Sequence, residues 1–152
     1  MSTQSMPTQT LPMKVPPAMI DNAPVSKTAR WSGRLLSGLV IVFLLFDGAI
    51  KLVPWPVVTE SMEKIGYGSS ETLARSLGVI SLVCTMLYAI PPTSFVGAIL
   101  LTGYLGGAMA SHLRIGSPLF THVLFGFYLG LMVWGGLWLR DPDLRRLLPF
   151  RR

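Results

Sequence analysis

Four long apolar stretches, nearly free of charge, limit what this chain can fold into more than any other feature of its sequence. They cover about residues 33–53, 72–90, 94–111 and 118–139. A helix of about 20 residues crosses the ~30 Å hydrocarbon layer of a membrane, and each stretch approaches or reaches that length. Prolines follow the first two stretches, and proline ends a helix. The sequence therefore predicts an all-α fold, an antiparallel bundle of four transmembrane helices.

The composition argues against a soluble protein. Hydrophobic residues make up 51% of the chain and charged residues 13%, whereas a soluble domain has about 25% charged residues. A chain of 152 residues cannot hide this much apolar surface in its own core. We therefore expect the lipid bilayer to be the main partner of the helix surfaces.

The ends of the chain differ from the apolar stretches. Residues 1–30 are rich in proline, serine, threonine and glutamine, which predicts a disordered cytoplasmic tail. Residues 31–149 form the predicted four-helix membrane domain, and residues 150–152 form a basic C-terminal segment. Between the first two stretches, Glu60 and Lys64 have the i, i+4 spacing of a helical ion pair. This spacing favours a short interfacial helix over about residues 56–65.

The positions of the basic residues predict the orientation of the helices. Nine of the thirteen lysines and arginines lie near the two ends of the chain. The other four, Lys51, Lys64, Arg75 and Arg114, lie near the first and third connections. Because basic residues are enriched on the cytoplasmic side of a membrane, we expect both termini in the cytoplasm. The same distribution argues against nucleic-acid binding, despite a net charge of +6.

Six polar residues fall at the outer level of the predicted bundle. They are Asp47, Lys51, Glu60, His112, Arg114 and His122. An ionisable residue within a membrane span is a candidate functional residue, so we expect a shared pocket that handles protons or holds a polar headgroup. The alternative is structural. An Asp47–Lys51 ion pair then closes the first helix, His112 favours a helix C-terminus, and Arg114 reaches toward the headgroups.

Motifs of known catalytic or metal sites are lacking from the sequence. Asp47, His112 and His122 offer one oxygen and two nitrogens, but without the dense spacing of a metal site. A haem between the two histidines would have to fit across one short connection. The single Cys84 excludes a C-x-x-C redox pair. We expect no metal; quinone is the one cofactor left open, and so is whether the chain is an enzyme.

Small residues recur along the third and fourth stretches. Gly103, Gly107 and Ser111 follow one another at i, i+4 and i+8, and Gly126 and Gly130 repeat the same spacing. Such a face lets another helix backbone approach closely. The partner helix lies in the same chain, in a second copy, or in another membrane protein, and the spacing does not choose between them.

Five short segments form a characteristic combination. They are residues 46–52 (FDGAIKL), 62–67 (MEKIGY), 103–114 (GYLGGAMASHLR), 118–120 (PLF) and 134–141 (WGGLWLRD). Over about residues 31–149 the chain resembles the DoxX-like family of small bacterial membrane proteins. The resemblance implies a four-helix membrane fold in the bacterial inner membrane. It carries no established catalytic residue onto this sequence.

The resemblance also sets the functional alternatives. The wider DoxX superfamily includes subunits of a thiosulfate:quinone oxidoreductase, partners in membrane redox complexes, and distant eukaryotic relatives in receptor assembly or cargo handling. Our first hypothesis is therefore a membrane subunit or assembly partner of a redox or other membrane complex. The second is a quinone- or sulfur-linked oxidoreductase component that uses the outer pocket. The third is a small transporter or lipid-handling protein.

Overall fold

The computed structural model describes residues 26–53 and 55–147, with side chains up to residue 144. The described residues form helices and no strands: α1 (Lys27–Leu52), α2 (Pro56–Lys64), α3 (Glu71–Ala89), the 3-10 turn η1 (Pro91–Thr93), α4 (Ser94–Arg114), the π-helical turn η2 (Leu119–Val123), α5 (Leu124–Arg140) and α6 (Pro142–Leu147). Four helices are long and apolar enough to cross a membrane: α1, α3, α4 with η1, and α5 with η2. The predicted fold class is therefore confirmed.

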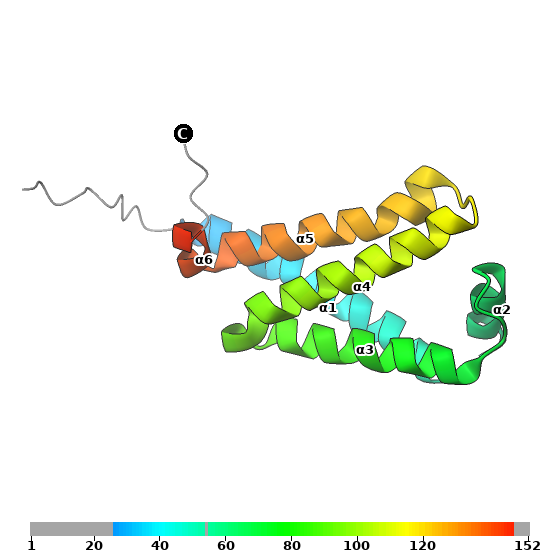
Figure 1. The fold of residues 1–152 in the computed structure, drawn as a ribbon. Helices are drawn as coiled ribbons and strands as arrows, with labels where there is room; N and C mark the ends of the chain where they lie inside the picture. The colour runs from blue at the N-terminus through cyan, green and yellow to red at the C-terminus, as the bar shows by residue number, and fades with distance from the viewer. Residues whose placement is uncertain (1–25, 54, 148–152) are drawn as a thin grey trace, which may run out of the picture.

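The four long helices form an antiparallel bundle with α2 across one end (Figure 1). Both α1 and α4 pack against α3 and α5, so α1 and α4 lie on opposite sides of the bundle. The beginning of α1 and the end of α5 lie at the end opposite α2 (Figure 1). We call this the basic end, after Lys27, Arg30, Arg34 and Arg140, and we call the other the α2 end.

Two glycines allow the closest helix approaches in the core. A Cβ atom at Gly97 of α4 would lie 2.2 Å from the backbone nitrogen of Tyr88 on α3. A Cβ atom at Gly136 of α5 would lie 2.6 Å from the Oγ of Ser37 on α1. The Tyr88 side chain is fully buried between these helices. Its hydroxyl forms a hydrogen bond of 2.9 Å with the Ser37 hydroxyl of α1 and donates to the Val133 carbonyl of α5 at 2.8 Å. Backbone contact and a satisfied buried hydroxyl thus fix the bundle near its basic end.

The outer surface of the long helices is apolar. Leu39, Val42 and Phe46 of α1 are each more than half exposed, and only 22% of the apolar segment of α1 is buried inside the protein. Such helices are stable in the hydrocarbon of a membrane, because exposing the same apolar side chains to water has a large free-energy cost. The chain is a multi-pass membrane protein.

The ends of several elements differ from the sequence predictions. Helix α1 begins at Lys27 rather than near residue 33, because the Ser26 hydroxyl accepts a hydrogen bond from the Ala29 backbone nitrogen at 3.2 Å. Helix α6 was not predicted, and it begins where Asp141 accepts from the backbone nitrogen of Asp143 at 2.9 Å. The predicted interfacial helix is α2. Of the tail predicted to be disordered, residues 1–25 lie outside the described residues, whereas residues 27–30 belong to α1, so the prediction is wrong there. The basic C-terminal residues 150–152 also lie outside the described residues.

Candidate functional site

Two neighbouring cavities lie at the α2 end of the bundle. The larger has a volume of about 290 Å³ and the smaller about 160 Å³. The larger is lined by Lys51, Met62, Ile65, Tyr67, Leu77, Gly103, Tyr104, Gly107, Ala108, Ser111 and His112. The smaller is lined by Phe43, Leu44, Asp47, Lys51, Tyr104, Leu105, Ala108, Met109, His112, His122, Phe125, Gly126 and Leu129. Lys51, Tyr104, Ala108 and His112 line both, so they form a shared wall between the cavities.

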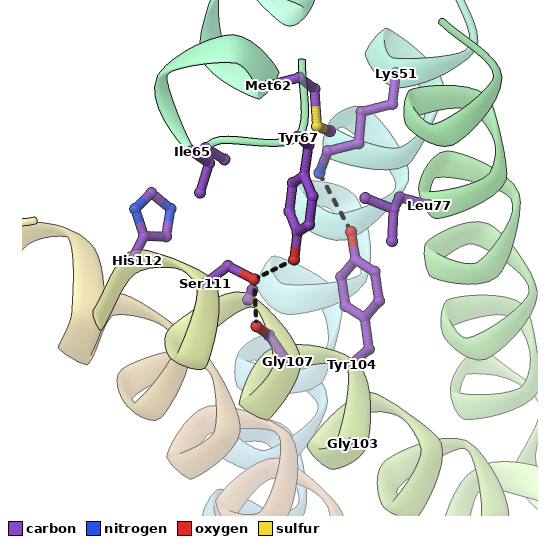
Figure 2. Close-up of a pocket in the computed structure, with 11 residues that line it drawn as sticks. Lys51, Met62, Ile65, Tyr67, Leu77, Gly103, Tyr104, Gly107, Ser111 and His112 are labelled. Carbon is purple, nitrogen blue, oxygen red and sulfur yellow. Dashed lines mark hydrogen bonds between the residues drawn. The ribbon is translucent and has the colours of Figure 1, made fainter. Parts of the chain in front are cut away.

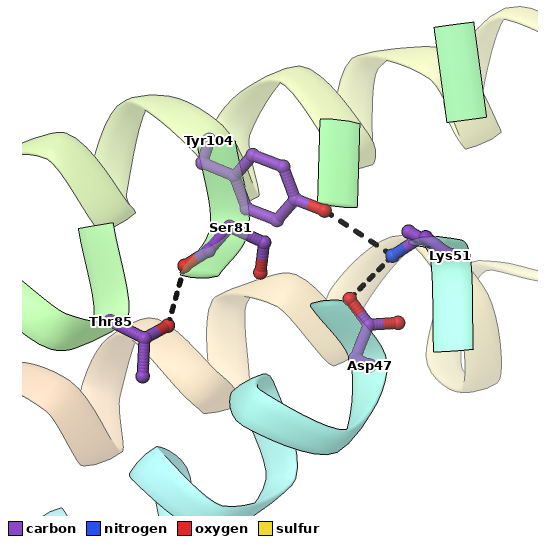
Figure 3. Close-up of polar contacts among 5 residues, drawn as sticks. All are labelled: Asp47, Lys51, Ser81, Thr85 and Tyr104. Atoms are coloured by element: carbon purple, nitrogen blue, oxygen red, sulfur yellow. Dashed lines mark hydrogen bonds and ion pairs between the residues drawn. The ribbon is translucent and has the colours of Figure 1, made fainter. Parts of the chain in front are cut away.

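The shared wall is organised around the ammonium group of Lys51. Lys51 forms an ion pair with Asp47 one turn earlier on α1, as the i, i+4 spacing predicted. The Lys51 Nζ also donates to the Tyr104 hydroxyl on α4 at 3.3 Å (Figure 3). Only 18% of the Lys51 side chain and 30% of the Asp47 side chain are exposed. A charge at this depth requires a partner, and here it has one carboxylate and one hydroxyl.

A second polar contact closes the larger cavity on its other side. The hydroxyls of Tyr67, in the loop after α2, and Ser111 of α4 share a hydrogen bond of 2.6 Å (Figure 2). Ser111 also donates to the Gly107 carbonyl at 2.8 Å. Gly66 before Tyr67 has a φ of +82°, a conformation that glycine adopts without strain. The loop can therefore turn sharply and place the tyrosine hydroxyl over α4.

His112 and His122 lie next to each other, although they come from different helical segments. Their ring centroids are 5.6 Å apart. The Nδ1 of His112 pairs with the Ser117 hydroxyl at 3.2 Å, and the Nδ1 of His122 pairs with the Thr121 hydroxyl at 2.8 Å. Among the described residues, no group of three or more histidine, cysteine, aspartate or glutamate side chains could hold a metal ion.

Two of the six predicted pocket residues lie outside both cavities. Glu60 is exposed on α2. Arg114 donates from Nη2 to the Ile65 carbonyl at 2.9 Å, and its guanidinium lies 5.6 Å from the centre of the Tyr67 ring. The geometry gives Arg114 a structural role, because it ties the loop after α2 to the end of α4. Asp47, Lys51, His112 and His122 are the four that lie together, around the smaller cavity.

The predicted small-residue faces divide into packed and open positions. Gly126 packs against α4, where a Cβ atom would lie 2.7 Å from Met109. Around Gly103, Gly107 and Gly130 nothing within the described chain lies within 4 Å of such an atom. Gly103 and Gly107 instead line the larger cavity. A close partner for these three glycines stays a prediction.

The two tyrosines of the larger cavity, Tyr67 and Tyr104, were not predicted from the sequence. Tyr104 lies eight residues before His112, a spacing that places both on one face of a helix, so the helical period could have identified it. Tyr67 offered no such signal, because it belongs to a loop. Ser81 of α3, drawn near Tyr104 in Figure 3, was also missed; its buried hydroxyl has no hydrogen-bond partner among the described residues.

The arrangement combines hydrogen-bonding groups with an apolar wall. The ammonium of Lys51 and the hydroxyls of Tyr67 and Tyr104 line the same cavity as the apolar side chains of Met62 and Leu77. Pockets for small molecules have this composition, a mostly apolar lining with a few converging polar groups. The larger cavity can therefore hold a small amphipathic molecule by its polar head.

Comparison with known proteins places the chain in a family. Residues 35–136 match the sequence profile of the DoxX-like family. No curated protein and no solved structure matches the chain. The match covers most of the helical bundle, including the segments that form both cavities. The chain therefore belongs to the DoxX-like family.

Proposed function

We propose that this protein is a membrane subunit that binds a quinone headgroup in the larger cavity and works together with a membrane redox complex. The observation that carries the proposal is the position of Lys51. Its ammonium lies in the shared wall of the two cavities, between the Asp47 carboxylate and the Tyr104 hydroxyl. This gives the larger cavity a charged hydrogen-bond donor that is already oriented.

The residues of the larger cavity fit a quinone ring. A quinone carries two carbonyl oxygens on opposite sides of a flat apolar ring, so it needs donors and an apolar wall. Lys51 and Tyr104 are the donors, since the Tyr67 hydroxyl already donates to Ser111, and Met62 and Leu77 form part of the wall. The volume of about 290 Å³ lies near the lower limit of small-molecule pockets, which are roughly 300–1,000 Å³. A bound quinone would supply acceptance and release of electrons and protons.

The histidine pair supports proton exchange next to this site. His112 lines both cavities and His122 lines the smaller one. Imidazole is the side chain that gains and loses protons most readily near neutral pH. The pair, with Asp47 in the same cavity, thus offers proton-carrying groups beside the ring position.

A role as a subunit is supported by Gly106 of α4, which is exposed and lines neither cavity. A Cβ atom there would meet nothing within 4 Å in the described chain. In membranes, small residues of this kind let a helix of a neighbouring protein approach closely. The wider superfamily contains subunits of redox complexes, which points to the same class of partner.

Replacing Tyr104 by phenylalanine is expected to weaken quinone binding about five-fold. The change removes one hydroxyl from the shared wall and leaves the ring, and a single hydrogen bond contributes about 1 kcal/mol. Titration of a short-chain benzoquinone into the purified protein in lipid nanodiscs, followed by calorimetry, measures the change in Kd.

Tyr128→Phe is the matched control, because Tyr128 is an exposed tyrosine of α5 that lines neither cavity. It is expected to leave the Kd of the quinone within about two-fold of the original protein. Equal affinities for both variants, or no saturable binding to the original protein, would contradict the proposal.

We further propose that both ends of the chain face the cytoplasm of a bacterium, in the inner membrane. The helix ends at Lys27 and Arg140 lie at the same end of the bundle (Figure 1), and this end carries the basic residues. Reporter fusions at both termini are expected to be active only when the reporter works in the cytoplasm. A periplasmic signal from either terminus would contradict this orientation.

A further inference from the structure

The basic end of the bundle contains a cavity that plays no part in the site at the α2 end. Its volume is about 340 Å³. Five segments meet there: the lining includes Arg34 of α1, Pro91 of η1, Ser94 of α4, Arg140 of α5 with the following Asp141, and Pro142 of α6. Two arginines thus face one cavity at the end of a membrane bundle.

Arg140 is held in place by the end of α3. Its Nη2 donates to the Tyr88 carbonyl at 2.9 Å, and its guanidinium lies 4.8 Å from the centre of the Tyr88 ring. The last carbonyls of a helix lack partners within the helix, so this contact satisfies one of them and places a positive charge where the helix dipole favours it. A guanidinium has five N–H groups, and the contact with Tyr88 occupies one.

Arg34 is held near Arg140 by the packing of α1 on α5. A Cβ atom at Gly33 would lie 2.7 Å from Leu139 Cβ and 2.8 Å from the Arg140 backbone nitrogen, so the two helices are in backbone contact there. The Arg34 side chain is exposed, and its guanidinium lies 5.9 Å from the centre of the Trp31 ring. Within the described residues, no carboxylate forms a salt bridge with either arginine.

The carboxylate of Asp141 also lines the cavity, but it has another function. Its Oδ1 accepts from the backbone nitrogens of Asp143 at 2.9 Å and Leu144 at 3.3 Å, which caps α6. The cavity therefore has two guanidinium groups and one carboxylate, and among the described residues this carboxylate forms no salt bridge with either arginine. An anion with several oxygens, such as a phosphate ester, is the ligand that guanidinium groups bind best.

The level of the cavity in the membrane identifies the source of the phosphate. Trp31 and Trp138 are exposed at the same end of the bundle, and tryptophan collects at the level of the lipid headgroups. The exposed Pro91 and Pro142 give the cavity an apolar side that a free phosphate ion would not use. We propose that this cavity binds the headgroup phosphate of an anionic phospholipid through Arg34 and Arg140.

The proposal is tested by lipid binding to the purified full-length protein after delipidation in neutral detergent. Phosphatidylglycerol, phosphatidylcholine and sodium phosphate are titrated separately, and native mass spectrometry counts the bound lipid. Phosphatidylglycerol is expected to bind at least about ten-fold more tightly than phosphatidylcholine, because only its headgroup is anionic. Arg34→Gln is expected to weaken its binding about five-fold, and Arg34→Lys to restore most of it.

Arg30→Gln is the matched control. It removes the same charge one helical turn earlier on α1, from an exposed residue that does not line the cavity. It is expected to change phosphatidylglycerol binding less than two-fold. A loss in Arg30→Gln as large as that in Arg34→Gln would show that general attraction, and not the cavity, binds the lipid. Sodium phosphate that displaces phosphatidylglycerol at millimolar concentration would overturn the lipid assignment.

Discussion

Replacing Gly97 by alanine is expected to lower the free energy of unfolding by about 3 kcal/mol or more, the largest effect of any single methyl group in the bundle. The new Cβ atom would lie 2.2 Å from the backbone nitrogen of Tyr88 and 2.5 Å from its Cα atom. A backbone cannot yield as a side chain does, so α3 and α4 must separate and the core around Tyr88 must open. Denaturant unfolding in detergent, followed by circular dichroism, measures the loss.

Gly106→Ala is the control on the same helix, because nothing in the described chain lies within 4 Å of its new methyl group. Alanine forms helices better than glycine by about 1 kcal/mol, so this variant is expected to be as stable as the original protein or slightly more stable. Equal stability of the Gly97→Ala and Gly106→Ala variants would contradict the contact between α3 and α4.

The second large effect is expected at the ion pair of α1. Asp47→Asn leaves the ammonium of Lys51 in a half-buried position without its carboxylate, and it is expected to cost about 2 kcal/mol of stability. Lys51→Met leaves the carboxylate alone and is expected to cost a similar amount. The double variant is expected to lose less than the sum of the two, because it leaves no unpaired charge. A double-mutant cycle by unfolding in detergent measures this coupling.

Glu71 and Arg75 provide the matched control for this cycle. They form an ion pair at the same i, i+4 spacing, 3.0 Å apart, but their side chains are 52% and 51% exposed. An exposed pair of this kind contributes less than about 0.5 kcal/mol, so its coupling is expected to be small. A coupling between Asp47 and Lys51 as small as that of the control pair would contradict the claim that the charge of Lys51 in the shared wall depends on Asp47 as its partner.

Apolar length and helical spacing were sufficient to predict the bundle and part of its polar site. The four spans were predicted because hydrophobic length in a membrane leaves few alternatives to a helix. The Asp47–Lys51 ion pair was predicted because both residues lie on one helix, where spacing determines contact.

Contacts between distant segments set the limits of prediction. Arg114 was grouped with the pocket from its level in the bundle, but it contacts the Ile65 carbonyl, which belongs to a loop whose path depends on Gly66 and Gly68. Tyr67 reaches Ser111 through the same loop. The glycine spacing of α4 predicted close packing, yet whether a glycine contacts a helix or lines a cavity depends on where the neighbouring helix lies. Spacing within one helix contains no information about that distance.

The two cavities at the α2 end share one positively charged side chain, that of Lys51. Lys51 is the only lysine among the residues that line either cavity, and its ammonium has three N–H groups to donate to acceptors in both. An acceptor bound in the larger cavity would hydrogen-bond to the same ammonium that forms the ion pair with Asp47 in the smaller one. Binding in the larger cavity is therefore expected to weaken the hydrogen bond between Lys51 and Asp47.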